Sequence, residues 1–141
     1  HYDARRRRLY LYRELHSAGL TNRRCAQLLR PWVGPRDRVV CDSAEPKSIA
    51  ELRAHGLRAV GARKGPGSVE YGIQWLQDLE EIVIDPARCP HSAREFAGYE
   101  LERDGAGEFT GGFPQKDDHH IDAVRYACEG LMLPPALDIL R

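Results

Sequence analysis

The sequence contains no apolar run near the roughly 20 residues that a membrane-spanning helix needs, and it opens on His1 and an arginine run instead of a signal sequence. Its four cysteines form no Cys-x-x-Cys pair, which is typical of a reduced intracellular protein and not of a disulfide scaffold. We therefore expect a soluble, cytoplasmic protein. Because a natural chain starts with Met, the initial His1 also leads us to expect a piece of a longer protein.

The chain has no excess of charge of either sign, since 21 basic residues balance 21 acidic ones. Total charge therefore does not identify a nucleic-acid binder. The charges are nevertheless unevenly distributed: residues 1–30 hold eight arginines against two acids, and residues 78–104 hold eight acids against three arginines. The N-terminal end is basic and the later middle is acidic.

Two familiar kinds of site are missing from the sequence. Cys89 and His91 flank Pro90, but no second pair stands at ligand spacing, so the sequence does not predict a zinc site. The glycine-rich residues 64–68 lack the G-x-x-x-x-G-K-[ST] order of a nucleotide-binding loop. Their backbone amides and Lys64 could contact a DNA phosphate, although a plain tight turn explains them equally well.

The pattern of apolar residues predicts one α/β domain of 141 residues without internal repeats. We expect strands at 9–16, 38–42, 57–60 and 81–85, and helices at 22–30, 43–55, from about 69, at 91–103 and at 119–133. A turn at residues 3–5 precedes the first strand, which makes the sheet mixed and flanked by helices. This arrangement is compatible with a ribonuclease-H-like sheet, and the pattern alone does not exclude a flavodoxin-like one.

Asp42 follows the predicted strand 38–42 at its carboxyl end, where open α/β sheets usually place catalytic groups. A second interpretation is that Asp42 caps the next helix, because Ser43 begins that helix and Pro46 suits its first turn. Position alone favours the capping role.

Three acids and two histidines gather at the start of the last helix, in residues 117–122. Asp118 and Asp122 are four residues apart, so they would share a helix face and repel each other unless a cation lay between them. Oxygen ligands of this kind favour Mg²⁺ or Mn²⁺ over zinc. Alternatively, the helix dipole alone favours acids at this end.

Three separated segments together resemble the nuclease domain of phage and prophage large terminase subunits. They are residues 41–49, residues 64–69 with 71–73, and residues 119–127. Their order along the chain makes the resemblance specific, and it extends from Tyr2 to about Leu131.

The resemblance implies a ribonuclease-H-like fold in which three acids hold two divalent ions, Mg²⁺ or Mn²⁺, and cut concatemeric double-stranded viral DNA during packaging. Asp42 matches the second of these acids and Asp122 the third, while Asp118 is a further candidate ligand. The first acid belongs on a strand before Asp3 that this chain lacks, so we expect residues 1–141 to be an N-terminally truncated nuclease domain without its ATPase domain.

Further roles follow from the same resemblance. His119 and Lys64 are expected to be auxiliary to the metal site, and Gln115 stands where relatives often have an acid. DNA contacts are expected from Lys64, Lys47, Arg6 and Arg7, although an arginine run can also be a solvated hairpin tip. Implied partners are double-stranded DNA, the portal protein and the small terminase subunit, in the cytoplasm of a bacterial host cell.

Two alternatives stay open at this point. Another ribonuclease-H-like nuclease, such as a Holliday-junction resolvase, would use the same carboxylate chemistry on branched DNA. A non-catalytic DNA-docking or assembly fragment is the alternative of a different class, because one expected acid is missing.

Overall fold

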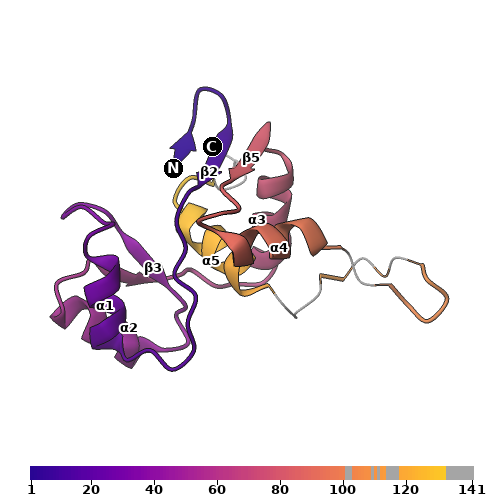
Figure 1. Ribbon diagram of the computed structural model, residues 1–141. Helices are drawn as coiled ribbons and strands as arrows, with labels where there is room; N and C mark the ends of the chain where they lie inside the picture. The colour runs from indigo at the N-terminus through magenta and orange to yellow at the C-terminus, as the bar shows by residue number, and fades with distance from the viewer. Residues whose placement is uncertain (101–102, 109, 111, 114–117, 133–141) are drawn as a thin grey trace, which may run out of the picture. The chain divides into compact units, whose positions relative to one another are not determined.

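The computed structural model of the protein describes residues 1–100, 103–108, 110, 112–113 and 118–132 (Figure 1). The chain divides into two compact units. The first unit combines His1–His16 with Val69–Asp122, and the second combines Ser17–Ser68 with the chain from Ala123 onward.

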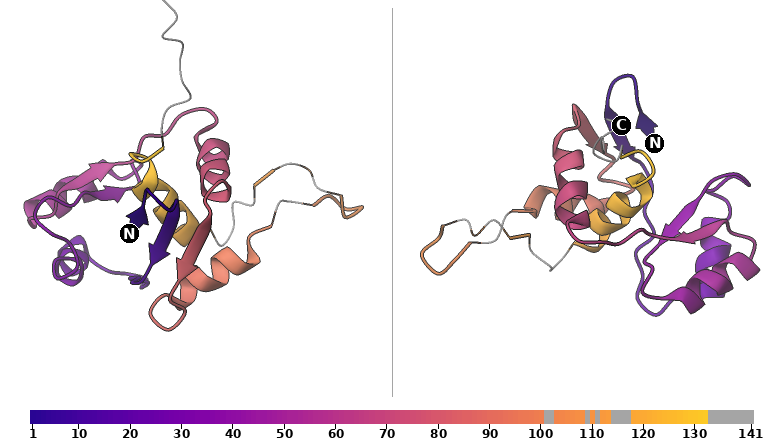
Figure 2. Two further views of the ribbon diagram at one scale, coloured as in Figure 1. Left: turned by 90° about the horizontal axis from the view of Figure 1, so that it is seen from above. Right: turned by 180° about the vertical axis from the view of Figure 1, so that it is seen from behind.

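A mixed three-stranded sheet forms the centre of the first unit, in the order β1-β2-β5. Strand β1 (Tyr2–Asp3) pairs antiparallel with β2 (Arg8–Leu11), and β2 pairs in parallel with β5 (Glu81–Ile84). The hairpin between β1 and β2 is visible at the N-terminus in Figure 2. This confirms the turn and the mixed sheet that the sequence predicts.

The hairpin turn is held by the side chain of Asp3. Its Oδ1 accepts hydrogen bonds from the backbone N–H groups of Arg5 and Arg6, both at 3.1 Å. Arg7 adopts a left-handed backbone with φ of 51°. An Asp that bonds the backbone two and three residues ahead is a typical turn former.

Strand β2 is shorter than the predicted 9–16 and ends at Leu11. Its parallel partner supplies only four residues, and the last pair is Leu11 with Ile84. The ladder stops at Asp85, whose N–H bonds the Leu11 carbonyl at 3.0 Å, because the next N–H on that side, that of Ala87, bonds the Asp85 side chain at 3.0 Å instead. Residues 12–16 leave the sheet as an irregular segment.

Helices α3 (Ser68–Gln77), α4 (Pro90–Gly98) and the first turn of α5 (His119–Cys128) complete the first unit. In α3, Ile73 and Leu76 are buried, whereas Val69 in the first turn is 37% exposed.

Helices α4 and α5 end earlier than the sequence predicts. Helix α4 ends at Gly98 instead of 103, consistent with the low helix propensity of glycine. Helix α5 ends at Cys128 and Gly130 follows, so Leu131 is no longer helical and is 46% exposed.

The second unit packs two helices against a parallel strand pair, β3 (Val39–Cys41) and β4 (Ala59–Gly61). Its core is apolar and small, with Ala26, Ile49, Leu52, Leu57 and Ala59 at the centre. Helix α1 (Asn22–Leu29) begins as predicted, because the Thr21 side chain accepts a hydrogen bond from the Arg24 N–H at 3.2 Å.

Helix α2 (Pro46–Ala54) begins three residues later than the predicted Ser43. Pro46 suits the first helical position, but it also disfavours helical backbone in the residue before it. Glu45 accordingly has φ of −117° and ψ of 67°.

Among the described residues, no helix combines the length and apolar composition that crossing a bilayer requires.

Candidate functional site

Asp42 stands directly after β3, at the carboxyl end of the parallel strand pair. Its Oδ1 accepts a hydrogen bond from the Ala44 N–H at 2.8 Å and lies 2.6 Å from the Lys64 Nζ. Helix α2 is preceded by Glu45, so Asp42 is not its cap. The capping interpretation is therefore wrong, and the carboxylate instead pairs with the Lys64 ammonium.

The ion pair of Asp42 and Lys64 is half exposed, with 50% and 42% of the two side chains accessible. The hydrogen bond from the Lys64 ammonium and that from the Ala44 N–H lower the pKa of Asp42, and the carboxylate in turn raises the pKa of Lys64. Exposed pairs of this kind contribute little to stability. A divalent cation could therefore replace the ammonium at small cost.

The loop at residues 64–68 is a tight turn. The Ser68 N–H bonds the Gly65 carbonyl at 3.1 Å, and Gly67 has φ of 73°, which glycine adopts easily. The turn places the Lys64 ammonium on Asp42 and 5.5 Å from the centre of the Tyr126 ring. In this structure Lys64 pairs with a carboxylate, and its predicted contact with phosphate stays a prediction.

The second predicted carboxylate, Asp122, lies in the first turn of α5 and is partly buried. Asp118 immediately precedes the helix, and its carbonyl accepts the Asp122 N–H at 2.8 Å. His119 is exposed at the first helical position. Asp42 and Lys64 belong to the second unit and these three residues to the first, so the joint role of Asp42 and Asp122 stays a prediction.

The predicted DNA contacts lie on exposed parts of both units. Arg6 is paired with Asp3 at 3.0 Å, and the Arg7 guanidinium donates to the carbonyl of Asp78. Lys47 is exposed in the first turn of α2. Gln115 and Asp117 lie outside the described residues.

Glu95 of α4 fixes the start of α5. Its Oε2 accepts hydrogen bonds from the backbone N–H groups of His120 at 2.7 Å and Ile121 at 3.1 Å. These amides belong to the first helical turn, where no carbonyl of the helix can pair with them. Glu95 thereby positions the turn that carries Asp122, a role that its local sequence does not indicate.

Replacing Glu95 with Ala is expected to lower the free energy of unfolding by about 1 kcal/mol, because two first-turn amides lose a charged acceptor. Thermal melts would show this as a decrease of about 4 °C. The control is Glu100→Ala, which removes an exposed acid nearby. Equal melting temperatures for both variants would contradict the capping role.

Glu14 is an enclosed acid of the first unit, with 7% of its side chain exposed. Its carboxylate accepts hydrogen bonds from the Ser92 N–H and hydroxyl at 2.9 and 2.8 Å, and from the His91 N–H and Nδ1 at 2.9 and 2.7 Å. Burial alone raises the pKa of Glu14, but these hydrogen bonds outweigh it and lower the pKa to about 2. Glu14 therefore fastens residues 12–16 to the start of α4.

Comparison with known proteins gives a consistent result. The family model described as "Terminase RNAseH like domain" matches residues 2–130. The chain is 43% identical over 131 residues to the large terminase subunit of Bacillus phage SPP1. It is 33% identical over 132 residues to the PBSX phage terminase large subunit of Bacillus subtilis strain 168. These matches cover 92% and 90% of the chain but 31% and 29% of the relatives, so the chain spans about a third of their length.

The structure is similar to the crystal structure of the large terminase nuclease domain from bacteriophage SPP1 with bound Mn. The TM-score is 0.86 at 43% identity, and the match covers 94% of this chain and 76% of that one. The likeness confirms the ribonuclease-H-like α/β fold. The flavodoxin-like alternative is thereby excluded.

Proposed function

Because the chain belongs to the family of terminase ribonuclease-H-like domains, we propose that it is a metal-dependent endonuclease domain that cuts concatemeric double-stranded viral DNA during genome packaging. The main support is its likeness to a terminase nuclease domain that was solved with bound Mn. Asp42, ionised at the end of β3 and already facing a cation, is the kind of group that such chemistry requires.

The proposed metal ligands are Asp42 and Asp122, with Asp118 as a further candidate and another acid on the strand before the Asp3 turn. Two divalent ions at such carboxylates would activate a water molecule and stabilise the leaving oxygen of the cleaved phosphodiester. Glu95 holds the helix turn of Asp122, so that this ligand is positioned before an ion arrives. His119 at the same turn stays an auxiliary group.

Lys64 has two roles in this proposal. While the metal is absent, its ammonium neutralises Asp42 at 2.6 Å. Asp42 would hold a divalent ion in place of the ammonium, and Lys64 would then be available to a phosphate oxygen of the DNA. In this proposal Lys64 contacts DNA phosphate only when a metal ion is bound at Asp42.

Replacing Lys64 with Gln is expected to tighten Mn²⁺ binding up to about fivefold. The Lys64 ammonium competes with the ion for Asp42, and the ion pair that it forms contributes at most about 1 kcal/mol. The same change should weaken DNA cleavage. Mn²⁺ affinity can be measured by electron paramagnetic resonance of the free ion. Lys47→Gln, an exposed lysine of the same unit, is the control and should leave Mn²⁺ affinity unchanged. Weaker Mn²⁺ binding by Lys64→Gln would contradict the displacement.

DNA is expected to be held mainly through its backbone, by Lys64, Lys47, Arg6 and Arg7, so sequence preference should be weak. The portal protein and the small terminase subunit are the proposed packaging partners.

The function is tested by incubating plasmid DNA with the nuclease domain, including the proposed full strand before the Asp3 turn, in Mn²⁺ and in chelator. We expect cleavage in Mn²⁺ only, and cleavage of linear duplexes at least as good as that of four-way junctions. Cleavage that needs no metal would overturn the proposal. A strong preference for junctions would favour a resolvase instead.

A further inference from the structure

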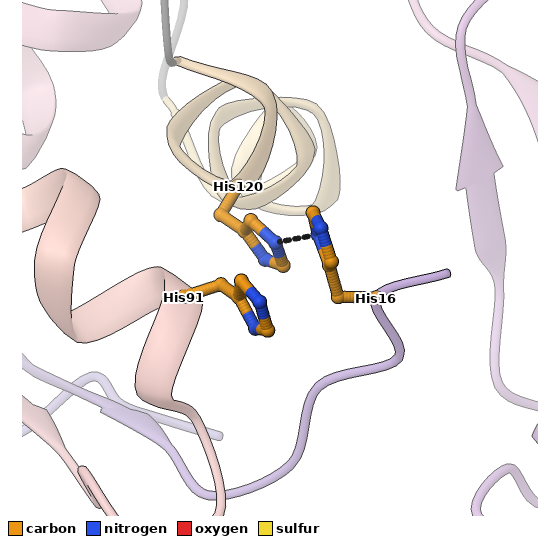
Figure 3. A group of neighbouring side chains, drawn as sticks. All are labelled: His16, His91 and His120. Carbon is orange, nitrogen blue, oxygen red and sulfur yellow. Dashed lines mark hydrogen bonds between the residues drawn. The ribbon is translucent and has the colours of Figure 1, made fainter. Parts of the chain in front are cut away.

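Three histidines of the first unit converge although they are far apart in the sequence (Figure 3). His16 follows β2 in the irregular segment, His91 lies in the first turn of α4, and His120 lies in the first turn of α5. One ring nitrogen from each lies within 4.8 Å of the other two. None of the three is among the residues proposed to hold the nuclease ions.

Two of these rings have one nitrogen already engaged by a buried acceptor. The Nδ1 of His91 is 2.7 Å from Glu14 Oε1. The Nδ1 of His120 is 3.2 Å from the Ser92 hydroxyl, which itself donates to Glu14 Oε2 at 2.8 Å. Because each Nδ1 carries its proton toward Glu14 or Ser92, the Nε2 atoms of His91 and His120 present lone pairs.

The third ring meets one of these lone pairs. The Nδ1 of His16 lies 3.0 Å from the Nε2 of His120, so a single proton is shared between the two nitrogens. A metal ion can take the place of this proton if His16 carries its own proton on Nε2 instead. His16 is exposed, so its ring can change tautomer and orientation without disturbing the core.

We propose that His16, His91 and His120 form a binding site for one transition-metal ion of the zinc class. The ligands are the Nε2 atoms of His91 and His120 and the Nδ1 of His16, and a water molecule takes the fourth position of the tetrahedron. Imidazole nitrogen favours Zn²⁺, Cu²⁺ or Ni²⁺, whereas the carboxylates Asp42 and Asp122 favour Mg²⁺ or Mn²⁺. The two sites therefore select different metals.

Glu14 and Ser92 supply the support that a histidine metal site needs. A carboxylate that accepts the other N–H of a ligating histidine fixes the ring and makes the coordinating nitrogen more basic. Here the buried Glu14 carboxylate bonds the His91 ring directly, and it bonds the Ser92 hydroxyl that in turn contacts the His120 ring. The rings of His16 and His91 are stacked, with centroids 3.8 Å apart and planes 14° apart. Because the lone pair of an imidazole nitrogen lies in the ring plane, the exposed His16 ring must turn before both rings can bind one ion.

The ion would join three segments that hydrogen bonds and stacked rings already bring together, namely the irregular segment after β2, α4 and α5. It would thereby fix the first turn of α5, which also carries Asp122. A zinc ion at this place is not required for the carboxylate chemistry.

The test is a zinc titration of the chain in competition with a chromogenic chelator, with Co²⁺ absorption as a second readout of coordination. We expect one ion per chain and the visible absorption of four-coordinate Co²⁺. His16→Ala and His91→Ala should abolish both signals. Glu14→Gln should lower the affinity by about 10- to 100-fold, as loss of a supporting hydrogen bond does in such sites.

Matched variants separate this site from other sources of zinc binding. His55→Ala removes a histidine of the second unit, and His1→Ala removes the ring beside the terminal amine; both should bind zinc like the wild type. Asp122→Asn should also retain zinc, even if it abolishes DNA cleavage. Zinc binding that survives His16→Ala, or that disappears in Asp122→Asn, would overturn the proposal. Because His16 is exposed, we expect His16→Ala to fold. This variant therefore tests the zinc site even if His91→Ala does not fold.

Discussion

Replacing either Asp42 or Asp122 with Asn is expected to reduce metal-dependent DNA cleavage by at least about 1,000-fold. Each change keeps the size of the side chain but removes one negative charge that would hold a divalent ion. Metal ions supply several kcal/mol of transition-state stabilisation in reactions of this type, and about 4 kcal/mol corresponds to that factor. The effect should appear in the rate of cleavage at saturating DNA.

Folding and catalysis can be separated in the same variants. The pair of Asp42 and Lys64 is half exposed, so Asp42→Asn should change the free energy of unfolding by less than about 1 kcal/mol. Asp78→Asn, at an exposed acid in the turn after α3, is the matched control and should cleave at the wild-type rate. Near-normal cleavage by Asp42→Asn or Asp122→Asn would remove that residue from the metal site.

Replacing Glu14 with Gln is expected to cause the largest loss of stability, about 3 kcal/mol. The pKa of Glu14 falls from its usual 4.5 to about 2 in the folded protein, and each unit corresponds to about 1.4 kcal/mol. Gln would also present an NH₂ group to donors that need an acceptor. Because the folded-state pKa is lowered, this stabilisation is complete above pH 4.5 and is lost as the pH falls toward 2.

Urea unfolding at pH 7 and at lower pH measures this effect. Glu80→Gln, at an exposed acid before β5, is the control and should lie within about 0.5 kcal/mol of the wild type. The difference between wild type and Glu14→Gln should narrow as the pH decreases below 4.5. A difference under about 1 kcal/mol at pH 7 would mean that the hydrogen bonds to Glu14 do not outweigh its burial.

Features set by neighbouring residues could be predicted from the sequence. Thr21 identifies the start of α1, and Asp3 identifies the hairpin turn, because each bonds backbone within three residues. Element ends were less predictable. The end of β2 depends on the Asp85 side chain just beyond the partner strand, which takes the next backbone N–H, and the start of α2 depends on the effect of Pro46 on Glu45.

The same distinction holds for the functional residues. Asp42 and Asp122 belong to motifs that can be recognised locally, whereas their joint role at one metal site stays a prediction. Glu14 bonds residues 77 and 78 positions away, and His16 bonds a residue 104 positions away. No spacing rule links such residues, so the sequence indicated no zinc site where the structure brings three histidines together.

The most direct test of the proposed function is a crystal structure of the nuclease domain grown with Mn²⁺, with the ions located by their anomalous scattering. The account predicts Mn²⁺ bound by the carboxylates of Asp42 and Asp122, with the Lys64 ammonium displaced from Asp42. Mn²⁺ bound elsewhere, with the pair of Asp42 and Lys64 intact and Asp122 without an ion, would contradict it.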